Sequence, residues 1–343
     1  MVPVPQPDDA FPVRPFRSAL YTPGELYAGF DPAVVGSYAS TVDFRAFRST
    51  VLPMSREVGM LRALHDQAVT ECREDLLVGH RVVAIMGGHA LGRADPAFAL
   101  VAALARELSR EGCLVVSGGG PGAMEATHLG ALLGPATDDA LAAALDHLAR
   151  APHFPPGMDA LVRADGTVDA ALLEDLHAWQ VPAFEVLTGI PEAERGESLA
   201  VPTWFYGHEP PTPFATRVAK YFSNPLREDG LLAIAADGVV YAPGSAGTLQ
   251  EVFQDAAQNY YRTFHDRFSP MVFLDVDHHW STRFPVAPLL RELFGPERFA
   301  THITLTTEVS GVLAALGRRA LSEEGLTPIH PGTGTPCSDP ANN

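Results

Sequence analysis

Two glycine-rich turns carry the clearest chemical signal in the chain. The first follows the apolar run 114–117 and reads Gly-Gly-Gly-Pro-Gly-Ala-Met-Glu from Gly118. The second follows the apolar run 239–242 and reads Pro-Gly-Ser-Ala-Gly-Thr-Leu-Gln-Glu from Pro243. A strand that turns on glycines into a helix exposes backbone N–H groups at the positive end of the helix dipole, which is a favourable place for an anion. Two such turns predict a phosphorylated small molecule as the ligand, most simply a nucleotide.

The residues of both turns are therefore candidate ligand contacts. In the first turn we expect contacts from Gly118, Gly119, Gly120 and Gly122. In the second turn we expect them from Gly244, Ser245, Ala246, Gly247 and Thr248. A loose dinucleotide fingerprint is also present at the first turn, but the acidic residue that should follow it is missing, which disfavours a nicotinamide or flavin enzyme. The glycines of this turn can also be explained by close packing of a helix on a strand.

Glu251 lies three residues after Thr248, in the first turn of the helix expected there. Thr248 could bind a phosphate oxygen or simply cap the helix, and Glu251 could complete a capping box. A carboxylate beside a phosphate site is unfavourable unless it has a use, so we favour a functional role for Glu251.

Several other residues are weaker candidates for ligand contacts. Gly88, His89 and His208 follow predicted strands, and Met124 and Glu125 lie at the start of a predicted helix. Lys220 lies on the predicted helix 214–222. Lys220 is the only lysine of the chain and stands in no Gly-Lys-Ser/Thr sequence, which excludes a Walker A loop. It is also the only candidate Schiff-base lysine, on a predicted helix with no accompanying cofactor motif, so we disfavour a pyridoxal-dependent decarboxylase. The run Asp277-His278-His279 resembles a metal site only superficially, and we predict no metal and no cofactor.

Composition limits the class of protein. The chain has 343 residues with a net charge of −17, which argues against binding of nucleic acid. Its three cysteines form no Cys-x-x-Cys pair, so a reducing cytoplasm is the simplest location. No apolar run reaches the length that spans a membrane, and the start of the sequence shows no signal pattern.

The rhythm of strands and helices predicts an α/β fold with a parallel sheet covered on both faces. Strands are expected at residues 81–86, 113–117, 199–205, 238–242, 271–274 and 302–305. Helices are expected at residues 55–76, 96–110, 122–133, 140–150, 168–179, 214–222, 248–261, 287–294 and 308–321. Ser55 is the expected cap of the first of these helices, and residues 231–236 are expected to be the end of a further helix. We expect an irregular N-terminal arm over residues 1–54, packed on a main domain over 55–322. Within that domain residues 134–198 form a helical insertion, which would cover the site or reshape base specificity, and residues 323–343 form a disordered tail.

The two turns together resemble the motifs of the LONELY GUY (LOG) family, many of whose members were once labelled possible lysine decarboxylases. The signature of that family is Pro-Gly-Gly-x-Gly-Thr-x-x-Glu, and this chain has Ser245 in place of its second glycine. Gly87-Gly88-His89 and the stretch 120–126 look closer still to bacterial pyrimidine/purine nucleotide 5′-monophosphate nucleosidases. The resemblance covers residues 80–134 and 199–315.

This resemblance implies a modified Rossmann fold, assembled as a homodimer or a higher homo-oligomer. It implies hydrolysis of the N-glycosidic bond of a nucleoside 5′-monophosphate such as AMP, without a metal or redox cofactor. The catalytic glutamate of the family corresponds to Glu251. The catalytic arginine falls on Glu228 in the ungapped spacing, and a shift of one residue makes it Arg227, which we take. The alternative is a protein of the same fold that carries or senses a nucleotide or another phosphorylated cofactor without cleaving it.

Overall fold

The computed structural model describes residues 10–205, 208–264 and 267–317. Its centre is a seven-stranded parallel sheet in the order β4-β3-β2-β1-β5-β6-β7. The chain builds the sheet outward from β1 to β4 in one direction, then crosses back over β1 and builds β5 to β7 in the other. This is the doubly wound order of a Rossmann-like α/β fold, as the sequence predicts.

The strands are short and almost wholly buried. Their bounds are β1 Arg81–Met86, β2 Cys113–Ser117, β3 Ser198–Ala200, β4 Arg217–Val218, β5 Val239–Tyr241, β6 Met271–Leu274 and β7 Ile303–Thr306. Alternate residues of β1 face two different cores: Val83 and Ile85 belong to one, and Val82, Ala84 and Met86 belong to the other. A strand with apolar side chains on both faces fits only in a sheet that is covered on both sides.

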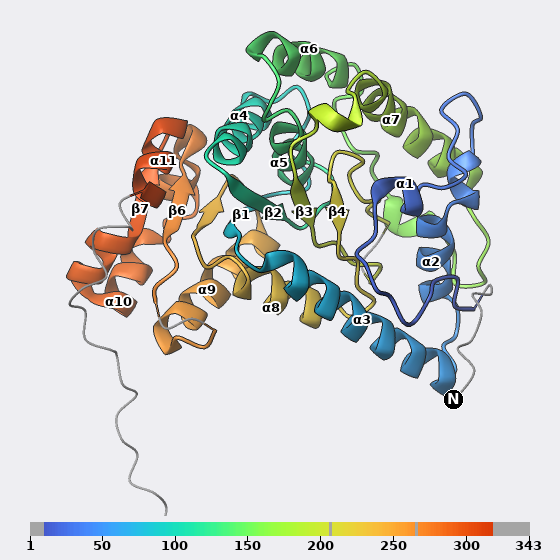
Figure 1. The fold of residues 1–343 in the computed structure, drawn as a ribbon, viewed down its shortest axis with the longest axis horizontal. Coiled ribbons are helices and arrows are strands. Elements are labelled where there is room, and N and C mark those ends of the chain that lie inside the picture. The colour runs from blue at the N-terminus through green and yellow to red at the C-terminus, as the bar shows by residue number, and fades with distance from the viewer. Residues whose placement is uncertain (1–9, 206–207, 265–266, 318–343) are drawn as a thin grey trace, which may run out of the picture.

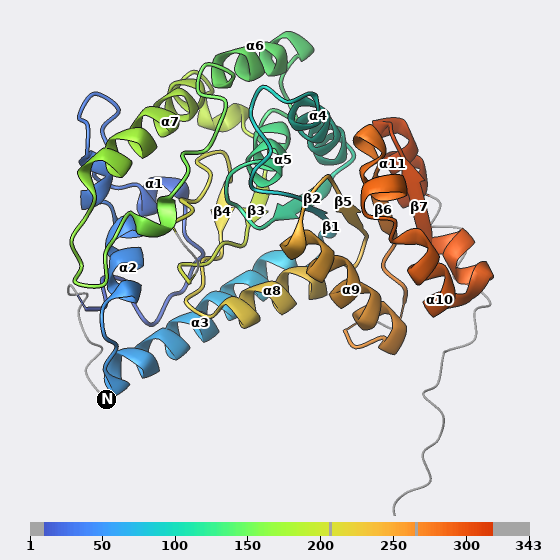
Figure 2. The same ribbon diagram turned by 180° about the vertical axis from the view of Figure 1, so that it is seen from behind.

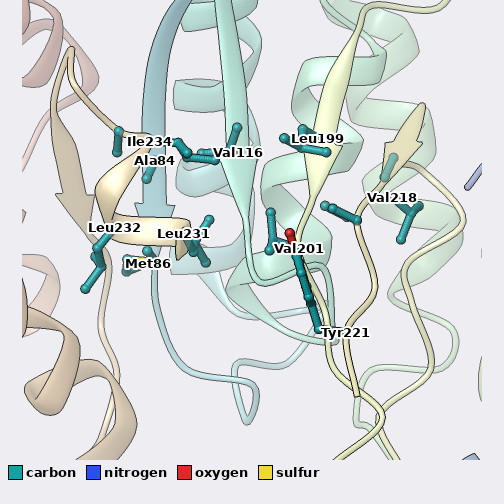
Figure 3. Packing of buried hydrophobic residues seen from close by; sticks show 14 of the residues in the cluster. Ala84, Met86, Val116, Leu199, Val201, Val218, Tyr221, Leu231, Leu232 and Ile234 are labelled. Atoms are coloured by element: carbon teal, nitrogen blue, oxygen red, sulfur yellow. The ribbon is translucent and has the colours of Figure 1, made fainter. Parts of the chain in front are cut away.

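Helices cover both faces of the sheet (Figures 1 and 2). One face is covered by α4 Pro96–Arg110, α5 Ala123–Leu132 and α11 Val309–Gly317. The other is covered by α3 Arg56–Leu77, α8 Asn224–Ala233, α9 Ala246–Tyr261 and α10 Ala287–His302. Figure 3 shows part of the second core, where Leu231, Leu232 and Ile234 pack beside Ala84 and Met86 of β1. Ser55 caps α3 by accepting a hydrogen bond from the N–H of Val58, as predicted.

Two further helices, α6 Asp138–Leu148 and α7 Ala170–Thr188, lie in the region that the sequence marks as an insertion. Both sit outside α4 and α5, away from the sheet, and α7 runs towards the N-terminal segment (Figure 1). The sequence places the second of these helices correctly but ends it nine residues early, at 179 instead of Thr188.

The N-terminal arm packs on the sheet but is not irregular. It contains α1 Pro23–Leu26 and α2 Val42–Val51, which the sequence analysis misses. Tyr21 forms an antiparallel bridge with Val218, with N···O distances of 3.0 and 2.8 Å. The arm thus covers the edge of the sheet at β4, which would otherwise expose unpaired backbone groups.

The predicted helix over 214–222 is wrong. That stretch contains the two-residue strand β4, and Lys220 follows it in extended chain rather than on a helix. Pairing of Val218 with Ala200 of β3 and with Tyr21 of the arm overrides the local helical pattern. The last predicted helix is observed as α11 up to Gly317, and the expected tail at 323–343 lies outside the described residues.

No helix in the described parts of the chain combines the length and apolar character needed to cross a bilayer.

Candidate functional site

A cleft of about 440 Å³ lies at the carboxyl ends of β1, β2 and β5. The direction of the sheet order reverses between β1 and β5, and ligands of doubly wound proteins bind at this switch point. The cleft is lined by Gly87, Gly88, His89, Gly118, Gly120, Met124, Pro202, Thr203, Glu209, Arg227, Ser245, Ala246, Gly247, Thr248 and Glu251. Most of the residues predicted from the two turns therefore lie around one cavity, whose volume is in the range of small-molecule sites.

The second turn presents unpaired backbone donors to this cleft. The first bond of the α9 helix runs from the N–H of Leu249 to the carbonyl of Ser245, at 2.9 Å. The N–H groups of Ala246, Gly247 and Thr248 precede that bond and have no partner within the helix. Ala246 and Gly247 are exposed to solvent. The N-terminus of α9 can therefore receive an anion without rearrangement.

Ser245 does not occupy the positive-φ region that favours glycine, because its φ is −127°. Gly244 is needed for a different reason, since a Cβ there would overlap the side chain of Thr248. The N–H of Gly244 is donated to Nε2 of His279 at 3.1 Å, so it does not point at a ligand. His279 belongs to the Asp277-His278-His279 run, and its structural partner is this turn. In the described residues no group of three or more His, Cys, Asp or Glu side chains is arranged to bind a metal.

Glu251 and Arg227 both line the cleft, from α9 and α8. Burial raises the pKa of Glu251 to about 7, with the positive charge of Arg227 opposing the rise and the charge of Glu228 adding to it. Arg227 is anchored by its Nε, which donates to the carbonyl of Val201 at 2.7 Å. Glu228 instead accepts a hydrogen bond from Asn224 at 2.9 Å and another from Gln250. The structure therefore places Arg227, and not Glu228, in the cleft.

The first turn is closed by packing. Gly122 has φ of +70°, and a Cβ on it would overlap the carbonyl groups of Gly88 and His89. The N–H of Ala123, the first residue of α5, is donated to the carbonyl of Gly88 at 3.1 Å. Gly119, with φ of +72°, packs against Ala200. Gly119 and Gly122 are absent from the lining of the cleft, and their missing side chains allow this close packing.

Gly118 and Gly120 do line the cleft, and the absence of side chains at these two positions leaves room for the side chains of neighbouring site residues. A Cβ on Gly118 would overlap the guanidinium of Arg227, and one on Gly120 would lie 2.9 Å from Oε2 of Glu209. Glu209 is the site residue that the sequence analysis misses. Its carboxylate lies between the first turn and His89, 3.8 Å from Nδ1 of His89. The sequence analysis selects its neighbour His208 instead.

Besides Gly119, Gly122 and Gly244, three predicted side-chain contacts lie outside this cleft. Glu125 is fully buried and forms a bidentate ion pair with Arg93, with both N···O distances at 2.7 Å. Lys220 is buried and donates to Oδ1 of Asp43 at 2.7 Å. His208 is buried against Tyr38 and lines a neighbouring cavity. Charged residues inside a protein need partners, and Glu125 and Lys220 meet theirs away from the cleft.

No family model matches the sequence, and no curated protein matches it either. Solved structures with a similar chain trace include the Moco carrier protein from Chlamydomonas reinhardtii, at 12% identity and a TM-score of 0.39 over 70% of this chain and 96% of that one. Another is the molybdenum cofactor binding protein from Rippkaea orientalis, at 13% identity and a TM-score of 0.38 over 70% of this chain and 98% of that one. Similarity at this level carries no functional argument, so function must be inferred from the cleft.

Proposed function

We propose that the cleft binds a nucleoside 5′-monophosphate and hydrolyses its N-glycosidic bond to free base and ribose 5-phosphate. The observation that supports this most strongly is the position of Glu251, a carboxylate with a pKa near 7 on the helix whose N-terminus offers the anion site. The motif resemblance to the LOG family supports the same reaction. The resemblance also implies a homodimer or larger homo-oligomer, which stays a prediction.

In this proposal the 5′-phosphate accepts hydrogen bonds from the N–H groups that precede the first bond of α9. This anchoring supplies binding energy that orients the reacting end of the ligand. As the glycosidic bond breaks, the departing base takes up a proton from solvent and leaves an oxocarbenium-like sugar, which ionised Glu251 stabilises. Glu251 also orients the attacking water, which adds to the anomeric carbon and gives up a proton to solvent. The planar fork of Arg227 holds ribose or phosphate oxygens. The reaction so written requires neither a metal nor a redox cofactor.

The test is a chromatographic assay of base release. Purified protein is incubated with AMP, GMP, CMP, UMP and IMP, in parallel with Glu251→Gln, Arg227→Ala and the control Glu292→Gln, which alters an exposed glutamate on α10. We expect release of free base by the wild type and the control, and a loss of about 10²-fold or more in Glu251→Gln. Saturable binding without base release would contradict the hydrolase.

A carrier of a phosphorylated ligand is the second candidate. The observation that favours it is that the anion site consists of backbone N–H groups, so a phosphate can be held there without any contribution from Glu251 or Arg227. For a carrier, Glu251→Gln leaves affinity intact and there is no turnover to lose.

A further inference from the structure

A second cavity of about 360 Å³ adjoins the cleft. His89 and Glu209 line both cavities, so a ligand that fills the cleft can extend past these two side chains into the second one. The rest of its wall comes mostly from the stretch 153–159, which contributes His153, Phe154, Pro155, Pro156, Gly157, Met158 and Asp159. This stretch belongs to the region between α6 and α7, far in sequence from either glycine-rich turn.

The wall formed by residues 153–159 is held in place by Arg93. The backbone N–H of Arg93 donates to the carbonyl of Pro152 at 2.7 Å, and Nη1 of Arg93 donates to the carbonyl of Trp179 at 2.8 Å. The guanidinium lies 4.0 Å from the centre of the Trp179 ring, and that ring meets Phe154 edge-on at 5.0 Å. Glu125 neutralises the buried charge of Arg93. The cavity is therefore preformed.

The opposite wall is anchored to the N-terminal arm. Burial lowers the pKa of His208 to about 3, so its ring is neutral. The hydroxyl of Tyr38 donates to Asp43 at 2.7 Å, and Nε2 of His208 therefore donates to that hydroxyl, also at 2.7 Å. Asp43 also accepts a hydrogen bond from Lys220, and His208 ties the segment that carries Glu209 to Tyr38 of the arm.

The chemistry of the second cavity suits a flat heterocycle with N–H donors. Proline, phenylalanine and methionine side chains of the stretch 153–159 provide an apolar wall against which a ring can stack. At the junction of the two cavities stands the carboxylate of Glu209, and an ionised carboxylate can only accept hydrogen bonds. Two oxygens on one carboxylate match a ring N–H with an adjacent amino group, as guanine presents them.

We propose that the second cavity is the base subsite of this protein and that Glu209 selects a nucleobase with adjacent N–H donors. This inference rests on the proposed function, because it takes the phosphate of the same ligand to lie at the N-terminus of α9. The stretch 153–159 then determines which bases enter.

The test compares ligands by calorimetry on Glu251→Gln, in which turnover is slow enough to measure binding. The affinity for ribose 5-phosphate reports on binding in the cleft alone. GMP and IMP differ only in the 2-amino group that Glu209 would bind, so the ratio of their affinities reports on Glu209. We expect GMP to bind about tenfold more tightly than IMP, which corresponds to one hydrogen bond to a charged group. Adding Glu209→Gln should bring the two affinities together.

A blocking variant separates the two cavities. Ala90 lines the second cavity but not the cleft, so Ala90→Trp should lower GMP affinity to that of ribose 5-phosphate without changing the latter. Ala94→Trp is the matched control, because Ala94 is exposed and lines neither cavity. The base subsite is refuted if Ala90→Trp leaves GMP affinity unchanged, or if GMP and IMP bind alike, while ribose 5-phosphate still binds. If neither ribose 5-phosphate nor any nucleotide binds, the proposed function and the subsite are both wrong.

Discussion

The two glycine-rich turns look alike in sequence but serve different purposes. At the first turn, backbone from β1 closes over the start of α5, and Gly122 is required because any side chain would overlap the carbonyls of Gly88 and His89. At the second turn, the start of α9 is open to solvent, and a Cβ on Gly247 would contact nothing within 4 Å. A glycine-rich strand–helix turn can therefore be a packing device or an anion site, and only the surroundings of its N–H groups tell which.

The glutamates that follow the turns show the same contrast and give the largest expected effects. Glu251→Gln should lower turnover by about 10²-fold or more while the protein stays folded. Glu125→Gln should leave the buried guanidinium of Arg93 without its ion-pair partner and cost about 3–5 kcal/mol of unfolding free energy. Base-release assays measure the turnover of both variants, and urea unfolding measures their free energies of unfolding. A stable, inactive Glu125→Gln would break the comparison.

The first turn should not tolerate a side chain. Gly122→Ala combines an unfavourable φ with backbone overlap, and we expect it to cost about 3 kcal/mol or more in urea unfolding. Gly79→Ala is the matched control, since Gly79 has φ of +81° but nothing within 4 Å of an added Cβ. The difference between the two variants isolates the overlap. Equal costs would mean that the first turn is not closed by packing.

Activity should follow the ionisation of Glu251. With a pKa of about 7 and the carboxylate as the active form, kcat/KM rises about tenfold per pH unit below 7 and levels off above it. The sign for stability is opposite: because the folded pKa is raised, the protonated form favours folding, and that contribution is lost as pH rises from about 4.5 to 7. Glu251→Gln should abolish both dependences, which pH–rate profiles and unfolding curves would reveal. Activity that falls as pH rises towards 7 would instead make the protonated form the active one.

A small gain in stability is expected from Gly247→Ala. The position is near the start of α9, and an added methyl group meets open space, so alanine should add about 0.4–1 kcal/mol to the free energy of unfolding. The same methyl group lies at the anion site, so affinity for ribose 5-phosphate should fall. Thermal unfolding tests the expected gain in stability, and calorimetry tests the expected loss of affinity for ribose 5-phosphate. A loss of stability would show that this turn, like the first, is closely packed.

Ser245→Gly should have the smallest effect. Because Ser245 has φ of −127°, outside the positive-φ region that favours glycine, we expect a change within about 0.5 kcal/mol and unaltered affinity for ribose 5-phosphate. A marked improvement in affinity would mean that the serine restricts the turn.

Much of the fold follows from the sequence because strand and helix patterns repeat over whole elements. The runs that became β1 and α4 are predicted to the residue, since each has one strong apolar pattern and a clear boundary. The local pattern fails where tertiary contacts determine the secondary structure. Strand β4 is only two residues long and forms because it pairs with β3 and with the N-terminal arm. The arm helix α2 does have a buried apolar face, formed by Phe44, Ala46 and Phe47, but it is short and lies in a proline-rich arm, and the sequence analysis overlooks it.

The candidate site was harder to predict than the fold. The positions of Arg227 and Glu251 come from motif spacing, and both side chains line the cleft. Glu125, His208 and Lys220 lie near the cleft in sequence and in space, but each turns away towards a buried partner. Single-sequence reasoning can find the loop that approaches a site, but it does not show which neighbouring side chain points inward, as with Glu209 and His208.

The burial of Lys220 makes the chain its own reporter. Its ε-amine is the only one in the sequence, and its side chain is 1% exposed. It lies beneath Asp43 of the N-terminal arm, so an amine-specific reagent can reach it only after the arm leaves the sheet. Mass spectrometry can follow the rate at which this one lysine is labelled. That rate would therefore report how fast the arm detaches from the sheet, at a single residue and without an engineered probe.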